Sequence, residues 1–442
     1  MRNYSFKQIG NIAYPILVSA LMEQLIGTTD TAYLGRVGEV ELGASALGGV
    51  FFTVVFMLGM GFSIGAQILM ARRNGEGNYQ RIGSIFYHSL AFLLVLALLL
   101  FVGTRVFSPI ILESTIHSPR VLAATESYLH WRVYGFFFAF VNLMFRCFYV
   151  ATTHTRTLTL NSLVMVLSNV VLNYVLIFGH LGCPALGIAG AAIGSCLAEA
   201  ISTVFFVVYT WRAIPASKYA LNVVPRLKFT IIHKILGISI WTMVQNFLSL
   251  ATWFIFFISI EHLGESALAA TNIIRNISAF TFMTVIAFAS TASTLVGNLM
   301  GQGENDSVWP MLKQVLRMTY VVMCPITLFI SLCPDLIMSI FTSNAHLYDE
   351  ARSALYVLLS SYVFTIPAQI LLHAVSGTGN TRVALYMEFT ALIVYTVYVI
   401  IAIFHYRLPL TWCWASEIVY SSIICVLALV YIKSDRWKSK QI

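Results

Sequence analysis

Charged side chains are scarce in this chain of 442 residues, because Lys, Arg, Asp and Glu together make up only 10% of it, whereas hydrophobic residues make up 59%. An average soluble domain carries about 25% charged residues. The deficit excludes an ordinary soluble protein and indicates an integral membrane protein. Cysteine is also sparse: the seven residues include no CxxC pair, so we interpret them as packing residues and expect neither disulfides nor a bound transition metal.

Long apolar runs take the place of charge. About 20 apolar residues of helix cross a bilayer core, and the chain divides into twelve such stretches with short polar connections. Runs such as SLAFLLVLALLLFVG are apolar on every side, unlike the alternating strands of a membrane barrel, so the predicted fold is all-α. The expected spans are residues 12–35, 44–71, 84–107, 127–150, 158–179, 187–211, 235–260, 266–298, 312–333, 351–376, 383–405 and 410–432.

Basic residues gather on one side of these spans. With both termini in the cytoplasm, we assign 19 of the 26 Lys and Arg to the inside, six to the outside and Arg275 to a helix. The positive-inside rule therefore predicts a multi-pass protein of the cell membrane with both termini cytoplasmic. This bias explains the net charge of +8. Because the basic residues form no continuous patch, we expect the lipid bilayer and no nucleic acid as a partner.

An internal repeat is visible when the chain is aligned with itself at one constant, ungapped offset. The offset places Gly38, Glu39, Leu42, Phe56, Met57 and Phe62 on Gly264, Glu265, Leu268, Phe282, Met283 and Phe288, and THTR (153–156) on GNTR (379–382). A half with six helices returns the chain to its starting side. We therefore predict a parallel duplication of two pseudo-symmetric six-helix bundles, residues 1–215 and 216–442, as expected of a carrier with alternating access.

Several polar residues in the first half have no counterpart in the second. Asp30 aligns with Phe256, and Asn169 and Asn173, which share one helix face, align with apolar or aromatic residues. Ser195 and Glu199 have the same spacing in the sixth helix and align with Ser421 and Cys425. We expect all five to form an ion- or proton-coupling site.

A carboxylate at the centre of a membrane helix costs about 2.5 to 3.5 kcal/mol, so it needs a partner. Oxygen ligands suit Na⁺ or a proton and not a soft metal, and Asp30, Asn169 and Asn173 would hold the metal only if Na⁺ is the coupling ion. The alternative is a set of interhelical hydrogen bonds that stabilises the bundle.

Other embedded polar residues are less specific. Glu23 lies about two turns before Asp30 and either faces the same cavity or extends toward the interface. Arg275 either pairs with an acid or lines a cavity, and Glu388 either captures substrate or pairs with a neighbouring helix. Pro15 lies near the start of the first helix, where it predicts at least a kink.

Several segments together resemble the multidrug and toxic compound extrusion (MATE) transporters. They include YPILVSALMEQLIGTTDTAYLGRVGEVELGA, FSIGAQILMARRNGEGN, LSNVVLNYVLIFG, STASTLVGNLMGQGEN and HAVSGTGNTR. The resemblance spans nearly the whole chain. It implies a V-shaped efflux antiporter of twelve helices, which exports amphipathic, often cationic organic compounds in exchange for Na⁺ or H⁺.

The resemblance also implies roles for individual residues. Asp30 falls on the first-helix aspartate of the family, Asn169 and Asn173 on its fifth-helix polar pair, and Ser195 on a small hydroxyl position. Pro15 resembles the proline whose kink is linked to bending of the first helix.

This chain departs from the NorM-type members, which carry a Glu in the seventh helix and an Asp in the tenth. It has Gln245 and Gln369 there, which favours the DinF-like branch and argues against an ion site in the second half. We assign Gln245, Arg275, Gln369 and Glu388 to the substrate cavity.

Other functions fit the sequence less well. A flippase for a lipid-linked oligosaccharide, found in the same wider superfamily, would favour a strongly basic cavity, and Arg275 is its only support. A channel or an embedded enzyme lacks a filter-like repeat and a metal-binding spacing of its ten His. We therefore expect no catalytic residue, no cofactor other than the coupling cation, and a monomer.

Overall fold

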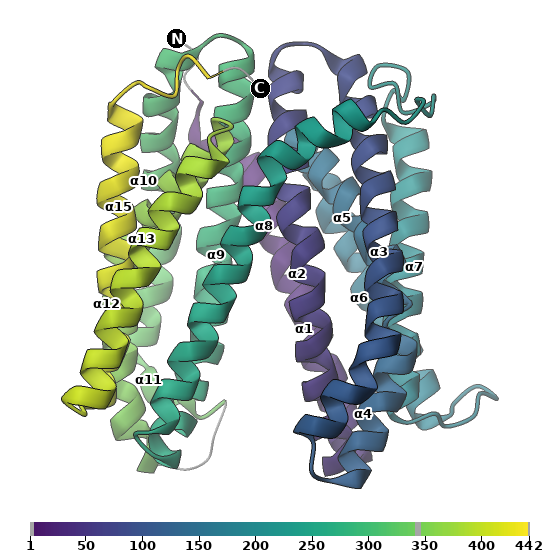
Figure 1. Ribbon diagram of the computed structural model, residues 1–442, viewed down its shortest axis with the longest axis vertical. Coiled ribbons are helices and arrows are strands. Elements are labelled where there is room, and N and C mark those ends of the chain that lie inside the picture. The colour runs from purple at the N-terminus through teal and green to yellow at the C-terminus, as the bar shows by residue number, and fades with distance from the viewer. Residues whose placement is uncertain (1–3, 341–345, 441–442) are drawn as a thin grey trace. The chain divides into compact units, whose positions relative to one another are not determined.

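The computed structural model describes residues 4–340 and 346–440, and every regular element among them is helical (Figure 1). The α-helices are α1 (Phe6–Val37), α2 (Glu39–Gly75), α3 (Tyr79–Thr115), α4 (Pro119–Arg132), α5 (Gly135–Ala151), α6 (Arg156–Phe178), α7 (Ile188–Ala213), α8 (Phe229–Glu261), α9 (Glu265–Gly301), α10 (Val308–Leu332), α11 (Pro334–Met338), α12 (His346–Gly377), α13 (Thr381–Ile400), α14 (Leu410–Trp414) and α15 (Ser416–Lys433). A 3₁₀ turn, η1 (Asn305–Ser307), precedes α10, and a π-helical turn, η2 (Ile401–His405), extends α13.

Membrane-spanning helices dominate this part of the chain. Eleven described helical segments are long and apolar enough to cross a membrane, and α4 with α5 forms a bent pair that makes twelve if it is one span. The all-helical, multi-pass prediction is therefore confirmed. Helices α2, α3 and α9 each contain 37 residues, more than predicted, because helical hydrogen bonding continues past the apolar stretch into the polar ends.

The predicted fourth span is not one straight helix. Helices α4 and α5 meet at an angle of 50° across Val133 and Tyr134. Around the break, backbone hydrogen bonds join residues three positions apart instead of four. The Tyr134 N–H donates to the Trp131 carbonyl, and the Phe136 N–H donates to the Val133 carbonyl. Such bonds tighten a helix end and change the direction of the chain.

Two compact units divide the chain. The N-terminal unit is Val18–Ser239, and the C-terminal unit contains the described residues up to Leu17 and from Ile240 onward. The chain therefore passes from one unit to the other inside α1, close to Pro15, and again inside α8. The boundary predicted at 215/216 concerns a sequence duplication, which the grouping of contacts does not test, and it stays a prediction.

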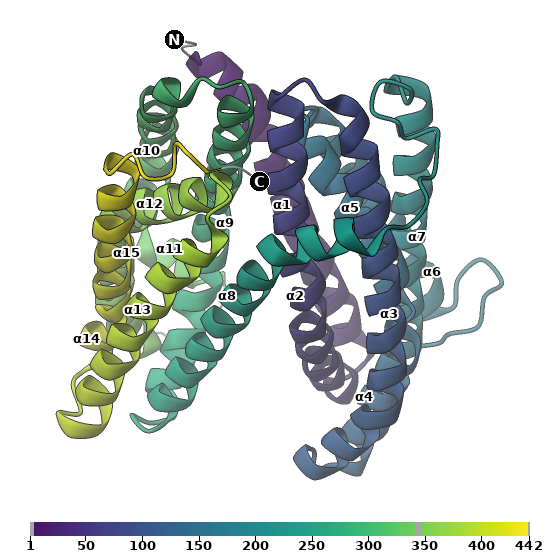
Figure 2. The same ribbon diagram turned by 45° about the horizontal axis from the view of Figure 1, so that its top comes forward.

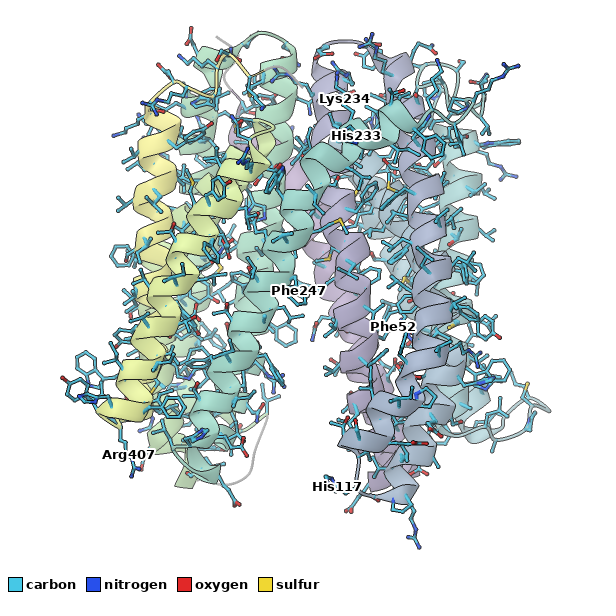
Figure 3. The ribbon with its side chains drawn as sticks, in the orientation of Figure 1. Phe52, His117, His233, Lys234, Phe247 and Arg407 are labelled. Carbon is cyan, nitrogen blue, oxygen red and sulfur yellow. The ribbon has the colours of Figure 1, made fainter. Side chains whose placement is uncertain are left out.

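In the N-terminal unit, α7 packs closely on α6 (Figure 2). Gly190 and Gly194 form a small-xxx-small pair on α7. A Cβ at Gly190 would lie 2.5 Å from the Leu176 carbonyl oxygen, and a Cβ at Gly194 would overlap Oδ1 of Asn173. Small residues let membrane helices approach in this way. In the same unit, His117 and Lys234 lie at opposite ends (Figure 3).

In the C-terminal unit, α12 packs against both α9 and α15. Two buried hydroxyl contacts join these helices: Thr281 of α9 meets Tyr362 at 2.5 Å, and Ser421 of α15 meets Thr365 at 2.9 Å. Gly377, near the end of α12, leaves no space for a Cβ beside the Ser293 backbone. The core of this unit therefore surrounds α12.

Candidate functional site

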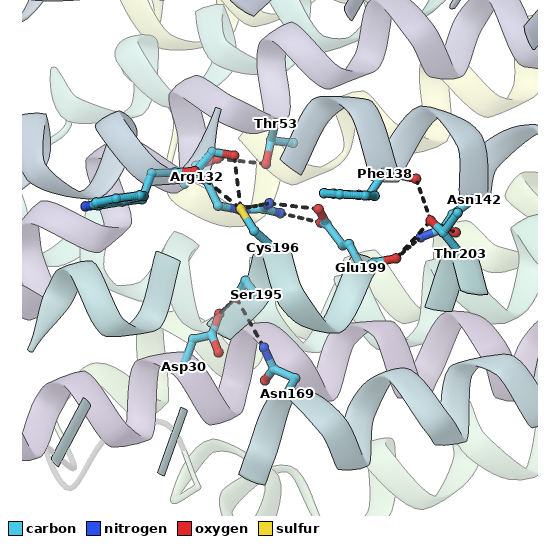
Figure 4. Close-up of polar contacts among 12 residues, drawn as sticks. Asp30, Thr53, Arg132, Phe138, Asn142, Asn169, Ser195, Cys196, Glu199 and Thr203 are labelled. Carbon is cyan, nitrogen blue, oxygen red and sulfur yellow. Dashed lines mark hydrogen bonds and ion pairs between the residues drawn. The ribbon is translucent and has the colours of Figure 1, made fainter. Parts of the chain in front are cut away.

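A hydrogen-bonded cluster joins α1, α6 and α7 in the N-terminal unit (Figure 4). The Asn173 amide and the Ser195 hydroxyl donate to the Asp30 carboxylate, at 2.5 and 3.2 Å. Asn173 also donates to Oδ1 of Asn169 at 3.2 Å, and Asn169 donates to the Ser195 hydroxyl at 3.1 Å. The structure thus brings together four of the five residues that the sequence singles out. Their role in ion coupling stays a prediction.

One oxygen of the cluster lacks a partner. Oδ1 of Asn173 is buried and accepts no hydrogen bond from any described residue. Buried polar atoms of native proteins are almost always satisfied, but this oxygen packs against α7, where a Cβ at Gly194 would overlap it. The Asp30 carboxylate, the Asn169 carbonyl and the Ser195 hydroxyl are oxygen ligands of the kind that suits Na⁺. The same carboxylate can instead take a proton.

We predict that Gly194→Ala impairs this cluster, because the added methyl group must displace the Asn173 amide. The transport that the sequence predicts should fall several-fold, within the range of about 10²-fold that misplacement by 1 Å can cost. The measurement is efflux of ethidium, a fluorescent organic cation, from proteoliposomes. Gly49→Ala is the matched control, since Gly49 is also a helical glycine of the N-terminal unit, on α2, but a Cβ there has open space. Equal activity of both variants would contradict the predicted role of the close approach.

Glu199 does not join the Asp30 cluster, contrary to the prediction. The Arg132 guanidinium binds both of its carboxylate oxygens, at 2.7 and 3.0 Å (Figure 4). The two side chains are only 12% and 8% exposed, and the guanidinium lies 3.7 Å from the ring centre of Phe52. A bidentate pair of this kind fixes both partners. Glu199 is therefore a compensated charge.

A second ion pair lies in the same unit. Nη1 of Arg146, on α5, donates to both carboxylate oxygens of Glu23, at 2.6 and 2.8 Å. Arg132 and Arg146 are not among the site residues predicted from the sequence, and only Arg275 is expected within a helix. The available signal was the occurrence of both arginines inside the apolar run 127–150.

Both ion pairs and Asp30 line one cavity of about 370 Å³ within the N-terminal unit. Its apolar wall includes Phe52, Phe56 and Phe206. No Lys or Arg of the described chain lies within ion-pair distance of Asp30. The cavity therefore combines two neutral pairs with one carboxylate that has no paired base.

The four residues assigned to the substrate cavity lie elsewhere. Glu388 is buried on α13, and Gln245 of α8 faces its carboxyl group. Gln369 of α12 faces Tyr420, which donates to Glu388. Arg275 is exposed on α9, 5.6 Å from the ring centre of Phe257. None of the four lines the cavity of the N-terminal unit.

A family profile described as MatE matches the chain twice, over residues 15–175 and 242–401. These matches cover more than half of the chain. The chain belongs to the MatE family. The second match starts and ends later in the chain than the first by the same offset that places Gly38 on Gly264, to within a single position. The MATE resemblance and the repeat are both confirmed by this match.

Proteins named as multidrug resistance proteins match most of the MATE chain. A probable multidrug resistance protein NorM of Thermotoga maritima is 23% identical and covers 99% of this chain and 94% of its own. One of Agrobacterium fabrum is 29% identical over 73% of this chain and 69% of its own. The leaning toward the DinF-like branch rests on Gln245 and Gln369 and stays a prediction.

Solved structures show the fold. An outward-facing multidrug resistance MATE transporter of the MOP superfamily has a TM-score of 0.89 at 16% identity, covering 99% of this chain and 97% of that one. A MOP superfamily transporter from Pyrococcus furiosus has a TM-score of 0.87 at 16% identity, covering 97% and 95%. This MATE protein therefore has the fold of these solved transporters.

Proposed function

We propose that this MATE protein is a multidrug efflux antiporter of the cell membrane, with both termini in the cytoplasm, which exports amphipathic organic cations in exchange for H⁺ or Na⁺. The names of its relatives support multidrug efflux. The observation that carries the antiport proposal is Asp30, a carboxylate without a paired base in an aromatic-walled cavity. Aromatic rings and a carboxylate are the groups that attract an organic cation.

The proposed mechanism depends on competition for one charge. Because Arg132 and Arg146 are each neutralised by a glutamate, Asp30 sets the net charge of the cavity. A proton or Na⁺ at Asp30 removes that negative charge and lowers the affinity for an organic cation. Coupling then requires only that the small cation and the drug prefer different states of the carrier. Bending of α1 at Pro15 is the proposed link between the loaded site and the change of state.

A flippase for a lipid-linked oligosaccharide has less support. The two arginines that line the cavity are each paired with a glutamate, so the cavity does not present the strongly basic surface that a diphosphate carrier would need.

We expect ethidium efflux from proteoliposomes to depend on one imposed cation gradient. The test imposes a Na⁺ gradient and a proton gradient separately, at equal membrane potential. One gradient should raise the initial rate several-fold, and the matching ionophore should cancel the effect. Efflux that ignores both gradients would contradict antiport, and transfer of a labelled lipid-linked sugar without ethidium efflux would favour the flippase.

A further inference from the structure

Glu388 is a buried carboxyl group without a cationic partner among the residues that the structure describes. Its side chain on α13 is only 2% exposed. One oxygen, Oε1, accepts hydrogen bonds from the Ser249 hydroxyl at 2.8 Å and the Tyr420 hydroxyl at 2.6 Å. The other oxygen, Oε2, is buried and has no partner among the described residues. Both hydroxyl groups therefore donate to one oxygen, and the second accepts no hydrogen bond from a described residue, although the Gln245 side chain faces the carboxyl group.

The internal repeat shows how this arrangement differs between the halves. The repeat offset aligns Ser249 with Glu23 and Glu388 with Ser162. In the first half the acid of this pair, Glu23, is neutralised by Arg146. The position equivalent to Arg146 in the second half is Leu372. The second half thus carries its acid on α13, at the position of Ser162 on α6, and has Leu372 at the position of Arg146.

No neighbouring helix supplies the missing charge. From α15, Tyr420 donates to Glu388, and Glu417 lies one turn earlier. From α12, His373 directs its Nδ1 to the Gln369 carbonyl of its own helix, at 2.9 Å. The groups that α8 directs at Glu388, the Ser249 hydroxyl and the Gln245 amide, do not titrate.

A charged carboxylate in this position would be costly. An unpaired ion inside a protein or bilayer loses its hydration, and in practice such a group becomes neutral. A proton on the bare Oε2 would make Glu388 neutral, while Oε1, as the carbonyl oxygen, would keep both of its hydrogen bonds. Loss of that proton needs only a change of state that admits water or a cation.

We propose that Glu388 is a second proton-binding site, located in the C-terminal unit on α13. The proposal extends the antiport function proposed above: the carrier then binds one cation at Asp30 and one proton at Glu388. It does not require that Asp30 be the coupling site.

The test is infrared difference spectroscopy of the purified protein across about pH 5 to 9, the range in which buried carboxyl groups titrate. We expect a protonated-carboxyl C=O band that disappears on alkalinisation and is lost in Glu388→Gln. Asp30→Asn should keep the band, and so should the matched control Glu417→Gln. Ser249→Ala should shift the band to higher frequency without abolishing it, because one hydrogen bond to the carbonyl oxygen is removed.

Proton release gives a second readout that separates a carrier from a structural acid. Ethidium binding in weakly buffered detergent solution should release about one proton per protein fewer in Glu388→Gln than in the wild type. A band absent in every variant, a band that pH does not change, or release equal to wild type would each overturn the proposal. A band that Na⁺ abolishes at constant pH would also overturn it, in favour of a sodium site. Failure of gradient-driven efflux, by contrast, would refute the antiport function and leave the infrared result standing.

Discussion

Asp30→Asn is expected to reduce gradient-driven ethidium efflux by about 5- to 150-fold, the size of a typical coupling free energy. Asn has nearly the shape of Asp and keeps an oxygen that can accept from Asn173 or Ser195. It cannot change its charge, so it cannot exchange a small cation for a drug. The measurement is the initial efflux rate from proteoliposomes under the gradient that drives the wild type.

The control for Asp30→Asn is the double variant Glu23→Gln/Arg146→Gln, which removes another acid from the same helix and the same cavity together with its base. Because the net charge of the cavity stays the same, this variant should have the smaller effect on coupling. Ethidium binding by Asp30→Asn should no longer be displaced by the coupling cation. Wild-type efflux in Asp30→Asn would make the carboxylate a structural group and leave Glu199 and Glu388 as the acids to test.

Arg132→Gln is expected to destabilise the protein by about 3 to 5 kcal/mol, because it leaves Glu199 buried without its partner. Thermal unfolding in detergent, monitored by circular dichroism, measures the loss. The double variant Arg132→Gln/Glu199→Gln should recover most of the lost stability, since two neutral amides replace two charges.

Arg146→Gln provides the matched comparison. Its ion pair with Glu23 is more open, with side chains 29% and 42% exposed, so its loss should cost only about 0 to 1 kcal/mol. Equal costs for Arg132→Gln and Arg146→Gln, or no recovery in the double variant, would show that burial of the Arg132–Glu199 pair does not set its energy.

Local sequence patterns predict much of this fold. Apolar runs locate the helices, and the spacing of Asn169 and Asn173 places both amides on one face of α6, where Asp30 meets them. The partner of Glu199 could not be predicted in this way. Arg132 is the last residue of α4 and lies at the 50° break, and that break is a tertiary feature which no periodicity encodes.

The surroundings of Glu388 in the second half could not be predicted for a related reason. An acid such as Glu388 attracts notice in an apolar helix, but its meaning depends on the helices around it. Ser249 and Tyr420 come from segments far away in the chain, and the lack of a nearby base is visible only after they are placed. A sequence shows which charges exist, whereas neutralisation depends on neighbours in space.

The division of α1 between the two units has a consequence for biosynthesis. The residues up to Leu17 group with the part of the chain from Ile240 onward, and a Cβ at Gly10 would lie 2.8 Å from Cε of Met318 on α10. At about 5 to 20 residues per second, the ribosome needs roughly ten seconds or more to reach those partners. The residues up to Leu17 therefore leave the ribosome well before their native neighbours from Ile240 onward, and they must wait in the membrane while the N-terminal unit assembles.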